Sequence, residues 1–160
     1  MGRHRGARGR YRVPAGPGDH PGVGRLRFGA GTRTSWTFRS GAAADTTLLP
    51  LLQVDYAVPV DARNAVGSQR THDLGLNVRM QDGMAAPRGV RRSVETSYDD
   101  GKTWATARTA PKGSGFTATV QRPAKVHGDA YVTLRVTAKD AAGNSVRQTI
   151  DRAYLHSGTR

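Results

Sequence analysis

Apolar and polar residues alternate along most of the chain from Thr32 onward, and this alternation limits the possible folds more than any other feature. The clearest run is Val132-Thr133-Leu134-Arg135-Val136-Thr137-Ala138, in which every second side chain is apolar. A period of two is that of a β-strand with one buried face and one face in water. Because turn residues separate such runs at short intervals and no run has a helical period, the sequence predicts an all-β fold.

The alternating runs predict an antiparallel sandwich of about seven to eight strands, of the immunoglobulin or fibronectin type III kind. We expect it to span residues 33–155, followed by a short tail at 156–160. Pro50 and Pro59 bracket one run, which favours the edge of a sheet for that strand, because proline cannot donate to a ladder. The other runs include Trp36, Leu76, Val94, Trp104, Ala118 and Val146.

Residues 1–32 lack the alternation and are rich in Gly, Arg and Pro, so we expect a disordered basic segment there. The chain has 25 basic and 12 acidic residues and a net charge of +13. An arginine-rich arm favours weak, non-specific binding of nucleic acid or another polyanion. A solvated tail is the alternative interpretation, with the arginine excess arising from a GC-rich genome. The arginines of this arm are Arg3, Arg5, Arg8, Arg10 and Arg12.

Several features are missing from the sequence. It has no cysteine, which excludes disulfides, thiolate metal sites and a cysteine nucleophile. No apolar run approaches the roughly 18–20 residues that span a bilayer, so no membrane partner is expected. The first residues, Met1-Gly2-Arg3-His4-Arg5, are basic but no apolar stretch follows them. The chain therefore has no signal peptide as written, and we expect it to stay in the cytoplasm if it is expressed in this form.

The sequence contains no recognisable catalytic, cofactor or metal motif. None of the histidines has a partner at zinc-binding spacing, and His72-Asp73 is interpreted as a turn at the start of a strand. Glu95 is the only glutamate, while Asp99 and Asp100 should point in opposite directions and make a poor acid–base pair. We predict no catalytic, cofactor-binding or metal-ligating residues, with calcium at the turns 99–101 and 140–144 left open.

Residues 97–104 predict a tight hairpin, because Asp and Gly are turn residues and the flanking residues continue as strands. The spacing Ser-x-Asp-x-Gly-x-Thr-Trp resembles the Asp-box, a hairpin motif of sialidase propellers and other secreted β proteins. The role of the Asp-box is mostly in folding. It occurs once, which argues against a propeller. The residues expected to build this structural Asp-box hairpin are Ser97, Asp99, Gly101, Thr103 and Trp104.

Three longer stretches, at residues 36–40, 94–104 and 132–144, carry a resemblance in their order and spacing. Together they resemble the non-catalytic C-terminal region of secreted subtilisin-like serine peptidases from actinobacteria. This resemblance implies an extracellular accessory β-sandwich whose partner in a longer relative is the peptidase catalytic domain. The peptidase motifs Asp-Ser/Thr-Gly, His-Gly-Thr and Gly-Thr-Ser-Met-Ala have no match here. We therefore expect no enzyme activity, and a chain that is a detached or truncated part of such a protein.

Two other functions remain open on the sequence alone. A carbohydrate- or surface-binding module would use exposed aromatic side chains, for which Trp36 and Trp104 are the tryptophan candidates, although both also suit a core. A nucleic-acid-binding protein would use the arginine-rich arm.

Overall fold

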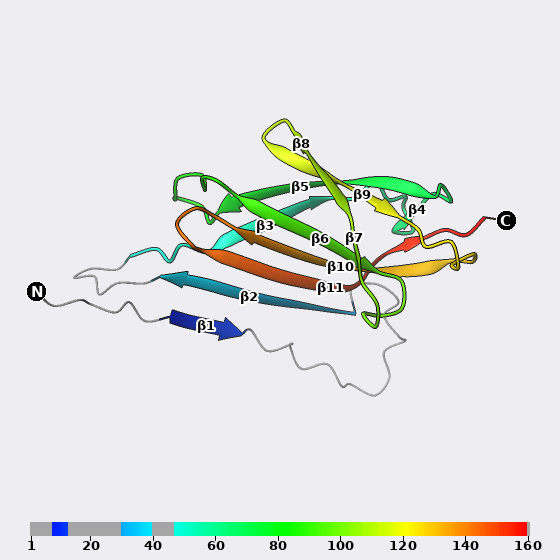
Figure 1. Ribbon diagram of the computed structural model, residues 1–160, viewed down its shortest axis with the longest axis horizontal. Coiled ribbons are helices and arrows are strands. Elements are labelled where there is room, and N and C mark those ends of the chain that lie inside the picture. The colour runs from blue at the N-terminus through cyan, green and yellow to red at the C-terminus, as the bar shows by residue number, and fades with distance from the viewer. Residues whose placement is uncertain (1–7, 13–29, 40–46, 160) are drawn as a thin grey trace, which may run out of the picture.

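The computed structural model describes residues 8–12, 30–39 and 47–159, and these residues form strands and turns with no helix. The prediction of an all-β antiparallel sandwich is confirmed. Figure 1 shows strands β2, β11 and β10 of one sheet running side by side, with β1 at the outer edge beside β2.

The larger sheet has the order β1-β2-β11-β10-β6-β7, with β4 attached to β11, and the smaller sheet has the order β3-β5-β9-β8. All neighbouring strands are antiparallel except β4 and β11, which are parallel. The strands of the larger sheet are β1 (Arg8–Arg12), β2 (Gly31–Arg39), β4 (Ala65–Val66), β6 (Arg91–Ser97), β7 (Ala105–Thr106), β10 (Ala130–Lys139) and β11 (Ser145–His156). Those of the smaller sheet are β3 (Leu52–Ala57), β5 (Thr71–Met80), β8 (Arg108–Lys112) and β9 (Gly115–Gln121).

The core lies between the two sheets and is built from the apolar faces of the alternating runs. Every second residue of β10 from Val132 to Ala138 is buried, as the alternation predicts. Val132, Leu134 and Val136 form one apolar cluster with residues of β6 and, from the other sheet, of β5 and β9. Ala138 belongs to a smaller cluster with Leu52 and Val146. The strand between the two prolines, β3, lies at an edge of the smaller sheet. This is expected because proline has no backbone N–H to donate to a neighbouring strand.

The structure contains more strands than the seven to eight that the sequence predicts, and the limits of the sandwich differ. β2 begins at Gly31, and β11 runs through His156, which is fully buried, so the expected tail contributes a core residue. Within the segment expected to be disordered, β1 pairs with β2 along its whole length. The rest of that segment, residues 1–7 and 13–29, lies outside the described residues.

A bulge interrupts the pairing of the two longest strands. Val132 and Leu134 of β10 pair with Tyr154 and Ile150 of β11, so residues 151–153 oppose a single residue of β10. Extra residues on one strand bend it and increase its twist. Before the bulge β11 pairs with β2, and beyond it β11 pairs with the short parallel strand β4. The bulge therefore changes the neighbour of the last strand.

Candidate functional site

The 97–104 hairpin brings together all five residues that the sequence singles out. The Ser97 hydroxyl donates to Asp99 Oδ1 at 2.7 Å and accepts the Gly101 amide at 2.8 Å. Asp99 also accepts from Thr103, from its amide at 2.8 Å and from its hydroxyl at 2.6 Å. Trp104 closes the loop by donating from Nε1 to the Gly101 carbonyl at 3.0 Å. The polar groups of these residues are thus used to close the turn.

The carboxylate of Asp99 is held in its ionised form by this arrangement. Hydrogen bonds from the Thr103 hydroxyl and amide and from the Ser97 hydroxyl lower its pKa well below the ordinary range. A carboxylate with such a low pKa is a weak proton acceptor at neutral pH. Asp99 therefore suits a structural role and not that of a general base.

β6 ends at Ser97, so Asp99 and Asp100 lie in the turn and the strand alternation expected for them does not apply. Asp100 fixes the hairpin to the bulge of β11. Its two carboxylate oxygens accept from Nε and Nη2 of Arg152, each at 2.9 Å. Both residues have left-handed backbones, with φ of 56° and 50°. The Arg152 amide donates to the hydroxyl of Thr133, the β10 residue that lies opposite the bulge, at 3.1 Å. This two-point ion pair fixes the orientation of both side chains.

Both tryptophans are used in packing. Trp104 lies beneath the guanidinium of Arg135, which is 3.9 Å from the ring centroid. Arg135 is held in turn by Glu95, with two hydrogen bonds of 2.7 and 2.9 Å. Trp36 donates from Nε1 to the Leu52 carbonyl at 2.8 Å and packs on the smaller apolar cluster. Trp36 and Trp104 are therefore both engaged by other side chains or carbonyls. They do not offer the exposed aromatic surface on which a carbohydrate-binding module stacks a neutral sugar.

The turn at 140–144 uses its carboxylate internally. Asp140 accepts from the amide and the side-chain nitrogen of Asn144, both at 2.9 Å, and both residues are buried. Gly143 supplies the left-handed position, with φ of 89°. Within the described residues, no three His, Cys, Asp or Glu side chains gather as a metal site would require.

The interpretation of His72-Asp73 as a turn is wrong, because His72 lies within β5 and points toward the last strand. Its Nε2 is 2.7 Å from the Tyr154 hydroxyl, and its ring meets that of His156 edge to face at 4.8 Å. His156 bonds on both sides, through Nδ1 to the Tyr98 hydroxyl and through Nε2 to the Gln69 carbonyl, each at 2.8 Å. Because a carbonyl only accepts, Nε2 of His156 carries a proton.

This histidine pair, His72 and His156, favours the uncharged state. Burial, reinforced by the neighbouring His156, lowers the pKa of His72 to about 4. Burial also lowers the pKa of His156, and burial raises the pKa of Tyr98 to about 12. The buried Nδ1 of His72 has no hydrogen-bond partner among the described residues. Protonating the pair places charge where solvation is poor.

We expect the protein to lose stability as the pH falls from about 6.5 toward 4. The unfolded chain has ordinary histidine pKa values, whereas His72 in the fold has a pKa of about 4. In that window the unfolded state binds more protons, so the free energy of unfolding decreases, by on the order of 1–2 kcal/mol for a partly exposed ring. Urea unfolding at about pH 7 and about pH 4.5 measures the difference.

His72→Gln should reduce this pH dependence, while His127→Gln, at an exposed histidine, should leave it intact. The carboxylates of Glu95, Asp99 and Asp100 have lowered pKa values, so their contribution is lost mainly below about pH 4.5. Equal stability of the parent chain at the two pH values contradicts the expectation.

The arginine-rich arm is described only in part. Arg8, Arg10 and Arg12 lie in β1, where the register pairs them with Arg39, Thr37 and Ser35 of β2. Arg3 and Arg5 lie outside the described residues.

Sequence reasoning missed Tyr98, Tyr154 and His156 as one connected group, together with the buried Arg122. Tyr154 and His156 share one strand face by their spacing of two, which was a usable signal. Arg122 directly precedes a proline at a strand end, and nothing in its local pattern distinguishes it from a solvated arginine.

Comparison with known proteins gives no relative for this chain: no protein-family model matches it, and neither does any curated protein sequence. Within the described residues, no helix is long and apolar enough to cross a membrane.

Proposed function

We propose that the chain is a non-catalytic accessory β-sandwich, the C-terminal part of a secreted subtilisin-like serine peptidase that works outside the cell. The proposal starts from the resemblance of the stretches 36–40, 94–104 and 132–144 to that region. Its partner is then the peptidase catalytic domain of the longer protein. The antiparallel sandwich supports the proposal, because many cell-surface domains share this architecture.

The observation that carries the non-catalytic part is the use of Ser97 and the histidine pair. The Ser97 hydroxyl bonds to Asp99 and to the Gly101 amide, not to an imidazole. His72 and His156 bond to tyrosine hydroxyls and a carbonyl. Nucleophilic catalysis needs a hydroxyl beside a base that a third group orients. These residues are arranged for stability instead.

We expect the purified chain to show no hydrolase activity. Incubation with casein should give no cleavage, and a fluorophosphonate probe, which reacts with activated serines, should not label it. A subtilisin sample in the same buffer is the positive control. Labelling that a single Ser→Ala change abolishes, together with casein cleavage, contradicts the proposal.

The accessory role has a separate test in the DNA upstream of this coding sequence. We expect a reading frame that encodes Asp-Ser/Thr-Gly, His-Gly-Thr and Gly-Thr-Ser-Met-Ala motifs and a signal peptide. The joined protein should be labelled by the fluorophosphonate probe, while the present chain stays unlabelled. An upstream region with no peptidase frame overturns the accessory role but leaves the prediction of an inactive chain standing.

A further inference from the structure

A cavity of about 570 Å³ opens where β7, β8, β9 and the start of β5 meet. This volume lies within the range of small-ligand sites. Its lining has hydroxyl, amide and guanidinium groups but no carboxylate and no aromatic ring. Its polar lining includes Arg70, Thr71, Thr106, Arg108, Gln121 and Arg122.

A second hollow of about 190 Å³ adjoins the first and continues its chemistry. The two share Arg70, Arg122, Pro123 and Ala124, and the second adds His127. Neither lining contains Asp or Glu. We call the two hollows together the basic cleft. Because the two hollows share lining residues and lie side by side, the basic cleft suits an extended ligand better than a single small ion.

Arg122 places a fixed positive charge beneath the basic cleft. Only 6% of the residue is exposed, and its guanidinium donates to the carbonyls of Val126, Gly128 and Ser157. No carboxylate among the described residues pairs with it. Its charge contributes to lowering the pKa of His156, after burial of that ring, so its field extends into the neighbouring core. A buried, uncompensated cation favours a negative ligand above it.

Arg70 and Arg108 stand at the two sides of the cleft with exposed side chains. Neither forms an ion pair or side-chain hydrogen bond with the described residues. The Arg122 amide of the segment after β9 donates to the Arg70 carbonyl, while Arg108 pairs with Thr119 on the opposite side of β9. Their backbones are separated by two strand spacings across the sheet, about 10 Å, and by three residues along it, about another 10 Å. Two carboxylates lie opposite lining residues by register, and both are already paired. Asp73 accepts from the Thr119 hydroxyl at 2.6 Å, and Glu95, opposite Thr106, accepts from Arg135.

We propose that the basic cleft binds an acidic oligosaccharide, one with sulfate or carboxylate groups repeated along a chain. Two separated arginines match repeated charges, and Thr71, Thr106 and Gln121 offer exposed polar groups for sugar hydroxyls. A nucleic acid is disfavoured, because the lining has no aromatic ring on which bases could stack. The inference is independent of the accessory role, since the cleft lies within this chain.

Calorimetric titration at about 150 mM salt tests the inference on the full chain. The probes are a heparin-derived hexasaccharide, an oligogalacturonate of equal length, neutral maltohexaose and single-stranded oligothymidylate. At least one acidic oligosaccharide should bind and maltohexaose should not. Response to the hexasaccharide alone shows that sulfate is required, and response to both acidic sugars shows that carboxylate groups suffice.

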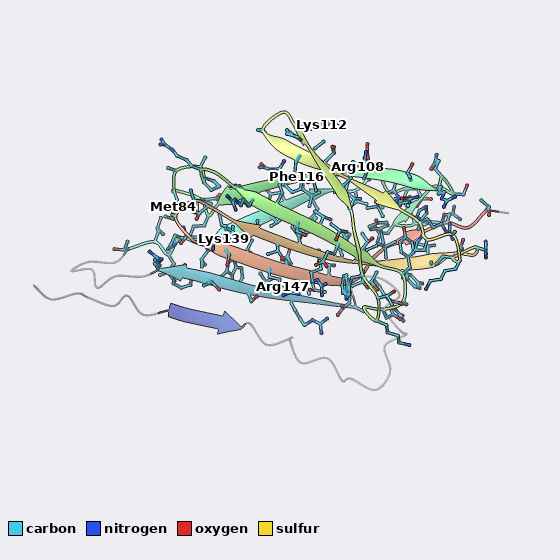
Figure 2. All side chains as sticks on the ribbon, viewed as in Figure 1. Met84, Arg108, Lys112, Phe116, Lys139 and Arg147 are labelled. Carbon is cyan, nitrogen blue, oxygen red and sulfur yellow. The ribbon has the colours of Figure 1, made fainter. Side chains whose placement is uncertain are left out.

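The double variant Arg70→Gln/Arg108→Gln should weaken this binding by about tenfold or more, because two charge-assisted contacts are lost. Arg147→Gln is the matched control, at an exposed arginine on β11 of the other sheet, and should stay within about twofold. Figure 2 labels Arg108 on β8 and Arg147 on β11, which lie in different sheets. Gln in place of the five arm arginines should likewise leave acidic-sugar binding within about twofold, which separates the cleft from the arm.

The inference is overturned if no acidic oligosaccharide binds, if Arg147→Gln or the arm variant loses as much affinity as the cleft variant, or if oligothymidylate binds more tightly through the cleft arginines. Thermal melts of each variant establish that it is folded. Should the double variant fail to fold, Arg108→Gln alone carries the same comparison, with a loss beyond about twofold expected.

Discussion

Replacing Arg122 by methionine is expected to lower the free energy of unfolding by about 3 kcal/mol, among the largest effects of any single change in this chain. The methionine fills much of the volume but donates to none of the carbonyls of Val126, Gly128 and Ser157. These carbonyls lie in the connection between β9 and β10 and in the segment after β11. Their loss of a shared donor therefore loosens two chain segments together. Urea unfolding gives the change directly.

Arg70→Met is the matched control for this prediction, because Arg70 lies beside Arg122 but is exposed and has no side-chain partner among the described residues. It should change the free energy of unfolding by less than about 0.5 kcal/mol. Arg122→Lys should fall between the two, since it keeps the charge but not the planar set of donors. A stability of Arg122→Met equal to that of Arg70→Met would show that the three hydrogen bonds contribute nothing net.

Gly101→Val should destabilise the fold by on the order of 1–3 kcal/mol. Gly101 has φ of 86°, a conformation that a β-branched residue adopts only with strain. A Cβ there would also lie 3.4 Å from the Trp104 ring, so the larger valine presses on the side chain that closes the 97–104 hairpin. The change thus acts on the backbone and on packing at the same point. Thermal melts measure it.

The control for Gly101 is Gly128→Ala, at a glycine with no left-handed φ and with no atom within 4 Å of an added Cβ. That change should be close to neutral. Substitutions in residues 1–30 should likewise cost less than Gly101→Val. Equal melting temperatures for Gly101→Val and Gly128→Ala would mean that the hairpin tolerates a side chain at this position, against the strain argument.

The sequence predicted those parts of the fold that depend on local pattern. Val132, Leu134 and Val136 alternate with polar residues, and all three are buried as expected. The 97–104 hairpin was also predictable, because its bonds join residues within four positions of one another. Local bonds of this kind follow from residue type and spacing alone.

The features that escaped prediction depend on which strands become neighbours. His72 meets His156 only because β5 faces the end of β11 beyond the bulge, and no local pattern encodes that meeting. The basic cleft has the same origin, since Arg70 and Arg108 reach it from opposite sides of β9. Partner choice between distant strands is set by the whole core, so single-sequence patterns do not reveal it.

The pairing of β2 with β11 also sets the order in which the two sheets can be completed during synthesis. Thr37 pairs with Ser145 and Gly31 with Asp151, so β2 waits for nearly the whole chain, whereas the smaller sheet has all its strands once β9 is made. At ordinary elongation rates the wait is on the order of ten seconds. Trp36 can already pack on Leu52 and the smaller sheet, but β2 gains its neighbour β11 only after Asp151 is made. The closure of the larger sheet is therefore a late event in synthesis.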